Sequence, residues 1–185
     1  MSSPLLVVIH GAPGSGKTTL ARRLRQDVTL PILGKDDLKE LLFETIPQSD
    51  RDFSRLQGAV AFDMLYAFAH QFLSEGQSVV IEGAFWHERS RKEIQTILDE
   101  TNAKVLELFC HVDEEVRLER FRQRAVNGER HPAHMDTDQA ATQPIPGRNF
   151  EKLAIGDCIE IDTHQSVTDE VYGEILKVIQ TRMER

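Results

Sequence analysis

The sequence has little of what marks a secreted or membrane-spanning chain. It holds two cysteines, Cys110 and Cys158, and both lie in apolar runs, so we expect buried reduced thiols and no disulfide framework. No apolar run approaches the ~20 residues that a membrane span needs. No basic segment followed by a long apolar stretch stands at the N-terminus. These absences leave a cytoplasmic location as the expectation.

Positive charge is also scarce. The 22 lysines and arginines are outnumbered by 30 aspartates and glutamates, and the formal net charge is -8. A surface of that sign repels nucleic acid and anionic membranes, so a polyanion would need a local basic patch. The 185 residues, 40% hydrophobic and 28% charged, have the size and composition of a single globular domain. We see no linker or internal repeat within residues 1–185.

Five short apolar runs alternate with segments of helical periodicity. The expected strands are Leu5–Ile9, Leu30–Leu33, Ser78–Ile81, Val105–Val112 and Cys158–Ile161. The expected helices are Lys17–Gln26, Asp37–Glu44, Asp50–Glu75, Arg89–Glu100, Asp113–Val126 and Thr168–Met183. Strands that alternate with helices predict βαβ units, and the lack of a two-residue period is typical of strands buried on both faces. The sequence therefore predicts an α/β fold with a mostly parallel sheet between two layers of helices.

Two of these helices carry further signals. Apolar residues recur at three- and four-residue steps within Asp50–Glu75, which predicts a stripe that faces the core. The stripe consists of Phe53, Leu56, Val60, Met64, Phe68 and Phe72. In the last helix, Thr168 is the expected N-cap, since a threonine hydroxyl accepts a hydrogen bond from the first turn.

A glycine-rich stretch, GAPGSGKT at residues 11–18, follows the first strand directly. It fits the pattern G-x-x-x-x-G-K-[ST] between a strand and a helix. Glycines let successive N–H groups curl around an anion, and the next helix adds its unpaired N–H groups and positive dipole end. Lys17 supplies a charge for the β- and γ-phosphates, and the Thr18 hydroxyl is a ligand for Mg²⁺. We expect ATP and Mg²⁺ here, with contacts from Gly11, Ala12, Pro13, Gly14, Ser15, Gly16, Lys17, Thr18 and Thr19.

An acidic pair, Asp36 and Asp37, follows the second expected strand. The carboxyl ends of parallel strands face the ligand crevice. The pair is therefore expected near residues 11–18, which we call the phosphate loop. A carboxylate there accepts the proton of an attacking hydroxyl, and we assign this task to Asp36. Asp37 is better placed to begin the next helix, and an N-cap role for either residue is the structural alternative.

Glu82 ends the third strand, and Arg120 and Arg124 lie on one face of the fifth expected helix. The Glu82 carboxylate suits a water ligand of Mg²⁺ or a substrate contact, with an ordinary polar strand end as the alternative. The two guanidiniums would stabilise the charge of a transferring phosphoryl group, unless they form a solvated basic face with Glu119.

A long polar loop follows, from Asn127 to Asn149. Loops of that length inside a compact domain are usually lids, binding loops or disordered segments. His131 and His134 lie in this loop, but no cysteine or carboxylate cluster accompanies them, which argues against a zinc site.

Together these residues resemble a small P-loop kinase of the polynucleotide-kinase and zeta-toxin-like group, related to adenylate, gluconate and shikimate kinases. The resemblance covers nearly the whole chain in matching order, through GAPGSGKTT, KDDLK, IEG, RFRQR, GERHPAH and IDTH. It implies a three-layer α/β/α P-loop fold with five parallel strands in the order 2-3-1-4-5 and residues 127–149 as a lid.

The same resemblance implies roles for further residues. Asp36 matches the general base, and Lys39 stands where a basic residue contacts the substrate. Glu82 and the lid residue Arg130 are also expected among the substrate contacts, and Thr163–Val167 is expected to border the adenine.

The function expected from these features is ATP-dependent transfer of the γ-phosphate to a hydroxyl of a small-molecule acceptor. A polynucleotide 5′-hydroxyl kinase is the alternative among enzymes, and the acidic balance without a basic, aromatic-interleaved surface argues against it. A nucleotide-binding regulatory ATPase without an acceptor is the alternative from another class. Such a protein needs no carboxylate beside the γ-phosphate.

Overall fold

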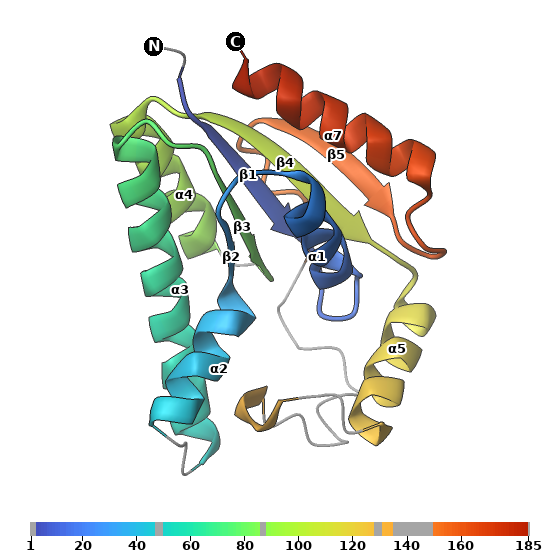
Figure 1. Ribbon diagram of the computed structural model, residues 1–185. Coiled ribbons are helices and arrows are strands. Elements are labelled where there is room, and N and C mark those ends of the chain that lie inside the picture. Colours follow the sequence, from blue (N-terminus) through green and yellow to red (C-terminus); the bar gives the residue numbers. More distant parts are fainter. Residues whose placement is uncertain (1–2, 47–49, 86–87, 128–130, 135–149, 185) are drawn as a thin grey trace.

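Five parallel strands form the centre of the computed structural model, which describes residues 3–46, 50–85, 88–127, 131–134 and 150–184. The strands are β1 (Leu5–His10), β2 (Ile32–Gly34), β3 (Val79–Gly83), β4 (Lys104–His111) and β5 (Asp157–Asp162). β1 lies in the middle, and the strand order is β2-β3-β1-β4-β5 (Figure 1). Every pairing is parallel, so the predicted sheet is confirmed.

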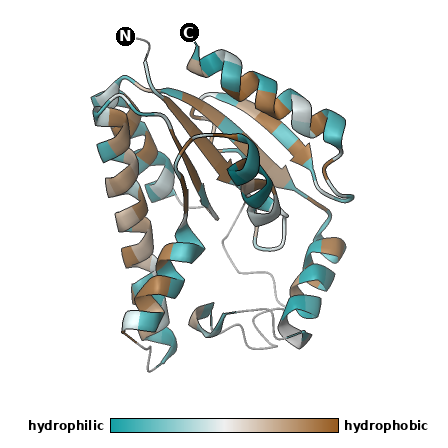
Figure 2. Cartoon of the chain, in the orientation of Figure 1, coloured by the Kyte–Doolittle hydropathy of each residue, from teal (hydrophilic) through white to brown (hydrophobic). Residues whose placement is uncertain are grey.

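Helices cover both faces of the sheet. Those that the structure describes are α1 (Lys17–Asp27), α2 (Lys35–Thr45), α3 (Arg51–Ser74), α4 (Glu88–Thr101), α5 (Glu114–Val126), the 3₁₀ turn η1 (Pro132–His134) and α7 (Asp169–Met183). α1 and α7 pack on one face and α3 and α4 on the other, each pair with its own apolar cluster. Figure 2 shows the apolar residues concentrated along the strands between these layers. The Thr168 cap is also confirmed, since its Oγ1 accepts a hydrogen bond from Val171 N–H at 3.3 Å.

The register of three strands aligns the residues that leave the sheet. Ile9 on β1 pairs with Glu82 on β3, and Glu82 pairs in turn with Gly34 on β2. The phosphate loop therefore starts at Gly11 at the same level at which α2 starts at Lys35. Parallel pairing alone brings these segments to one edge of the sheet, where ligands bind in open α/β folds.

The apolar stripe predicted on the long helix is only partly confirmed for α3: Phe72 packs against the core, whereas other members are exposed. Leu56, Val60 and Phe68 are 57%, 38% and 37% exposed. The buried side of α3 is formed instead by Ser54, Gln57, Ala61, Leu65, Tyr66, Ala69 and Leu73. α3 has apolar residues on more than one side, and small residues let a helix pack closely against its neighbours. Periodicity of the large side chains therefore does not select the side that is buried.

None of the helices in the described ranges is both long and apolar enough to cross a membrane. Of the expected lid, residues 127 and 131–134 are described, whereas residues 128–130, which include Arg130, and residues 135–149 lie outside the described residues. The lid and the role of Arg130 therefore stay predictions.

A buried carboxylate fixes the segment that leads into β5. Glu107 on β4 is fully buried and accepts hydrogen bonds from the N–H groups of Leu153 at 2.9 Å and Ile155 at 2.8 Å. His10 Nε2, at the end of β1, lies 3.2 Å from the same carboxylate. Burial by itself raises the pKa of Glu107, but the His10 contact and the two N–H groups outweigh burial and hold the pKa below its ordinary value.

Glu107→Gln is expected to lower the free energy of unfolding by about 1–3 kcal/mol at pH 7, because two backbone donors lose a charged acceptor. A depressed folded-state pKa stabilises the fold above the unfolded-state pKa, and this stabilisation is lost as pH falls through the folded-state pKa. Urea unfolding should therefore show a difference between wild type and variant that shrinks below the ordinary glutamate pKa of 4.5. Glu160→Gln, at an exposed surface pair with Lys152, is the control and should change the unfolding midpoint much less than Glu107→Gln, because solvent screens exposed pairs. A Glu107→Gln difference that is independent of pH contradicts this account.

Candidate active site

Three glycines shape the loop between β1 and α1. Gly11, Gly14 and Gly16 have φ angles of 148°, 91° and 79°, which residues other than glycine rarely adopt. Space is also restricted at Gly11, where a Cβ would collide with the carbonyl oxygen of Cys110. Within the loop, Ser15 N–H donates to the Ala12 carbonyl at 3.0 Å. A curled backbone that leads into the N-terminus of a helix is an arrangement that binds an anion.

Lys17 and Thr18 begin α1 and meet Glu82 at the end of β3. Thr18 Oγ1 donates to Glu82 Oε1 at 3.4 Å, and Lys17 Nζ lies 4.0 Å from the same oxygen. Burial raises the pKa of Glu82, and although Lys17 and Thr18 oppose this, the net shift is upward. The negative charges of Asp36 and Asp37 add to the rise, so both aspartates are close enough to act on Glu82. A hydroxyl and a carboxylate are hard oxygen donors that suit Mg²⁺, and a cation would favour the ionised glutamate.

The acidic pair lies in the first turn of α2. The helix begins at Lys35 with Gly34 as its N-cap residue, so it starts earlier than predicted and no side chain caps it. The expectation that Asp37 begins the helix is therefore corrected. Asp37 Oδ2 accepts a hydrogen bond from Arg25 of α1 at 2.5 Å, whereas Asp36 Oδ1 accepts one from Lys35 Nζ at 3.1 Å. Asp37 is thus engaged by an exposed arginine, and Asp36 by a largely buried lysine.

The two predicted arginines of α5 have different surroundings. Arg120 donates to the carbonyl oxygens of Thr163 and His164 at 2.5 and 3.1 Å. Arg124 stands beside the phosphate loop, since its Nη2 is 3.6 Å from the position of a Cβ on Gly14. Arg120 therefore holds the segment after β5, and Arg124 is the member of the pair that lies against the loop.

Arg117 also contacts the phosphate loop, although we did not predict it from the sequence. Its Nη1 donates to the Pro13 carbonyl at 3.4 Å, and its own carbonyl oxygen is 2.9 Å from a Cβ on Gly14. The signal was present in the spacing, because Arg117 precedes Arg120 by three residues and shares its helix face.

Thr163, in the segment expected near the adenine, is buried against the phosphate loop. Its Oγ1 lies within hydrogen-bond distance of the carbonyl oxygens of Ser15, at 3.0 Å, and His111, at 3.1 Å. A Cβ on Gly16 would stand 3.3 Å from the Thr163 side chain. This residue therefore ties β5 to the loop and to β4.

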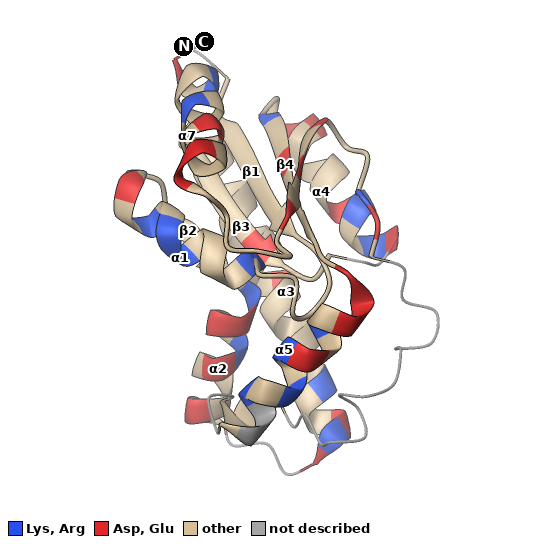
Figure 3. Ribbon diagram, turned by 90° about the vertical axis from the view of Figure 1, so that its right-hand side faces the viewer, with Lys and Arg blue, Asp and Glu red and all other residues tan. Residues whose placement is uncertain are grey.

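Lys39 and the two histidines gather on the other side, at α2. Lys39 is 7% exposed, and its Nζ donates to Ser54 Oγ on α3 at 2.8 Å. His134 lies 2.9 Å from Glu40 and His131 lies 3.8 Å from Glu44. In the part of the chain that the structure describes, no group of three or more His, Cys, Asp or Glu side chains is arranged to hold a metal ion. Figure 3 shows acidic and basic residues mixed along α2 and α5.

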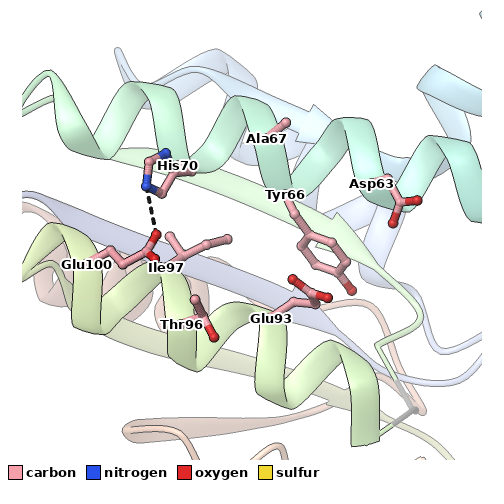
Figure 4. Close-up of a pocket in the computed structure, with 8 residues that line it drawn as sticks. All are labelled: Asp63, Tyr66, Ala67, His70, Glu93, Thr96, Ile97 and Glu100. Atoms are coloured by element: carbon pink, nitrogen blue, oxygen red, sulfur yellow. Dashed lines mark ion pairs between the residues drawn. The ribbon is translucent and has the colours of Figure 1, made fainter.

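A separate pocket lies between α3 and α4 (Figure 4). Its lining residues are Asp63, Tyr66, Ala67, His70, Glu93, Thr96, Ile97 and Glu100. Three carboxylates at this place would repel a triphosphate, and His70 already pairs with Glu100 at 3.1 Å. Burial raises the pKa of Tyr66 to about 12, so its phenol stays protonated at neutral pH. The charge and pairing of these lining residues make this pocket poorly suited to a nucleotide.

Comparisons with known proteins agree with this geometry. The model of a family described as an AAA domain matches residues 6–144. A candidate kinase from Chloroflexus aurantiacus, known as a crystal structure, is similar over 98% of this chain and 99% of its own, with 28% identity and a TM-score of 0.87. The APS kinase of Mycobacterium tuberculosis, solved with AMPPNP and APS, matches over 100% of both chains with 15% identity and a TM-score of 0.62. At that identity the similarity is one of fold. The resemblance to P-loop kinases is confirmed.

Curated relatives are longer than this chain. An uncharacterised protein of Mycobacterium tuberculosis is 25% identical over an alignment of 127 residues, and the match covers 65% of this chain and 26% of the relative. The chain thus spans about a quarter of the length of the curated relatives it matches.

Gly11→Ala is expected to weaken ATP binding by at least about tenfold, because the new methyl group collides with the Cys110 carbonyl and alanine is strained at this φ. Calorimetric titration with a non-hydrolysable ATP analogue measures the loss. Gly173→Ala is the matched control, since a Cβ there meets nothing within 4 Å. It should keep the affinity and add about 0.5–1 kcal/mol to the free energy of unfolding, the usual gain for a helix-interior glycine. Wild-type affinity in Gly11→Ala would contradict the assignment of the phosphate site.

Proposed function

The chain belongs to the AAA domain family, and we propose that it is an ATP-dependent kinase that transfers the γ-phosphate to a hydroxyl of a small-molecule acceptor. The observation that carries this proposal is the alignment of Ile9, Glu82 and Gly34 across three strands. It brings together a lysine-bearing phosphate loop, a carboxylate at the loop's threonine, and a second carboxylate in the first turn of α2. A nucleotide site needs the first two of these features, whereas a hydroxyl acceptor adds the need for the third.

In this proposal, the β- and γ-phosphates of ATP lie in the loop of residues 11–18. Backbone N–H groups and the start of α1 hold the phosphate oxygens, and the Lys17 ammonium neutralises part of their charge. Thr18 and Glu82 are the residues that would hold Mg²⁺, which would neutralise part of the charge of the phosphates. The 3.4 Å contact between Thr18 and Glu82 favours the metal side over a substrate contact for this glutamate.

Asp36 is the proposed general base. As the acceptor hydroxyl attacks the γ-phosphorus, its proton passes to the Asp36 carboxylate. The bond between the γ-phosphorus and the bridging oxygen breaks, and ADP leaves with the charge of that oxygen. The Lys35 ammonium, 3.1 Å from Asp36 Oδ1, fixes the direction of the carboxylate.

The arginines of α5 take two different tasks in this scheme. Arg124, beside Gly14, supplies positive charge at the transferring phosphoryl group. Arg120 acts through its hydrogen bonds to Thr163 and His164, which hold the segment proposed to border the adenine. Arg130 and the rest of residues 127–149 are proposed to close over the bound substrates and exclude water.

Asp36→Asn should reduce phosphoryl transfer by roughly 10²–10⁴-fold, the usual worth of a general base, and change ATP affinity little. The assay is ATP turnover against a panel of hydroxyl compounds that includes short oligonucleotides, with ATP binding titrated in parallel. Asp37→Asn is the matched control, because Asp37 is paired with the exposed Arg25. This variant is expected to leave the transfer rate nearly unchanged. Normal transfer by both variants would refute the kinase mechanism, and turnover of oligonucleotides alone would favour a polynucleotide kinase.

Glu82→Gln should raise the Mg²⁺ concentration needed for half-maximal activity, because the metal loses a carboxylate partner beside Thr18. The effect is expected to be about tenfold or more, the usual consequence of removing a group that supports a metal. Activity is measured across a Mg²⁺ titration at saturating ATP. An unchanged Mg²⁺ requirement would remove Glu82 from the metal site.

A further inference from the structure

The segment His131–His134, part of the stretch GERHPAH, docks on α2 and α3. η1 lies between α2 and α5 at the end of the molecule toward which β1 and β3 point (Figure 1). Ala133 is fully buried, and its carbonyl accepts a hydrogen bond from Ser54 Oγ of α3 at 3.1 Å. These contacts join two parts of the chain that are 79 residues apart.

Two histidine–glutamate contacts fasten this segment to α2. His134 Nε2 lies 2.9 Å from Glu40 Oε1, and the His134 side chain is 5% exposed. His131 Nδ1 accepts a hydrogen bond from Ala133 N–H at 3.2 Å, so the neutral ring carries its proton on Nε2. That nitrogen faces Glu44 Oε1 at 3.8 Å. We call residues 131–134 the clasp.

Ser54 connects the clasp to Lys39. The single hydroxyl proton of Ser54 is directed at the Ala133 carbonyl, so its oxygen is free to accept from Lys39 Nζ, which lies 2.8 Å away. The chain of hydrogen bonds therefore runs in one direction, from the ammonium through the hydroxyl to the clasp. An ammonium on a four-carbon stem has many rotamers, and a buried acceptor selects among them.

Lys39 lies next to the proposed base. Asp36 and Lys39 are three residues apart on α2 and are neighbours on its surface. Gly58 of α3 leaves room beside two lysines of α2, since a Cβ there would stand 3.9 Å from Lys35 Nζ and 4.0 Å from Lys39 Cε. α3 thus packs directly against the helix side that carries Lys35 and Lys39.

We propose that Ser54 is a positioning residue, through which the docked clasp sets the place of Lys39 beside the acceptor. This inference rests on the proposed function, and it takes Lys39 as a contact of the acceptor, as the resemblance to P-loop kinases implies. The acceptor side of the site is then fixed from α3 and from the clasp at once, whereas the nucleotide side is fixed by the phosphate loop. Loss of the Ser54 hydroxyl should change acceptor binding and leave nucleotide binding as it is.

The first test measures how firmly Lys39 is held and needs no acceptor. Ser54→Ala should raise the rate of Lys39 acetylation by acetic anhydride by about tenfold, the low end of the worth of a hydrogen bond to a charged group. Mass spectrometry reads this rate against that of Lys17, another buried lysine of the same protein. Ser54→Thr keeps the hydroxyl and should restore slow acetylation. Ser90→Ala, which removes an equally buried serine hydroxyl from α4, should leave the Lys39 rate at the wild-type value.

The second test uses an acceptor found in the panel. Ser54→Ala should raise the acceptor KM by roughly tenfold, while kcat and the ATP KM stay within about twofold of wild type. His134→Ala, which loosens the clasp from α2, should shift the acceptor KM in the same direction. A Lys39 acetylation rate that does not respond to Ser54→Ala overturns the positioning role.

Faster acetylation of Lys39 without a rise in the acceptor KM would contradict the proposed contact between Lys39 and the acceptor. If the ATP KM rises as much as the acceptor KM, the effect is general and the inference fails. If no compound in the panel is phosphorylated, the proposed function fails, whereas the acetylation result still decides whether Ser54 positions Lys39.

Discussion

The close packing of the phosphate loop is the constraint on which the rest of the site depends. Each of its three glycines approaches a different element: a Cβ on Gly11 would meet Cys110 of β4, one on Gly14 would meet Arg117 of α5, and one on Gly16 would meet Thr163 after β5. A displacement of the loop would therefore move α5 and the segment after β5 as well. This packing explains why Arg117, Arg124 and Thr163 lie against the loop although they come much later in the sequence.

Charge at the sheet edge is concentrated and partly buried. Lys17 and Glu82 are both buried, and a buried ion pair usually contributes little net stability because both charges lose their hydration. The pKa of Glu82 is raised by its burial and further by Asp36 and Asp37. Perturbed titration of this kind is typical of sites that bind charged ligands or perform catalysis. A phosphate–Mg²⁺ ligand would balance this arrangement, since it brings positive charge to the carboxylates and negative charge to Lys17.

α2 is the element at which the two halves of the proposed reaction meet. Its first turn carries Asp36, and its next turn carries Lys39, which is held from α3 through Ser54. α2 is also engaged by Arg25 of α1 through Asp37 and by His134 through Glu40. A helix held from several directions is suited to keep a base and an acceptor contact in fixed relation, and precise positioning is a large part of what phosphoryl transfer requires.

The sequence by itself determined the features that depend on local chemistry. Glycines at 11, 14 and 16 permit a loop with positive φ angles, the buried runs specify strands, and Thr168 specifies a helix start, so the parallel sheet and the glycine-rich loop could be predicted. Tertiary structure alone decided which side of α3 is buried, because apolar residues lie on several of its sides and only the neighbours select among them. Tertiary structure also places Arg124 against the phosphate loop, whereas Arg120 donates a hydrogen bond to Thr163, 43 residues away. The hydrogen bond from Lys39 to Ser54 is likewise a tertiary contact. Such contacts arise from the way distant segments pack, and no local pattern encodes the partner of a long, flexible side chain.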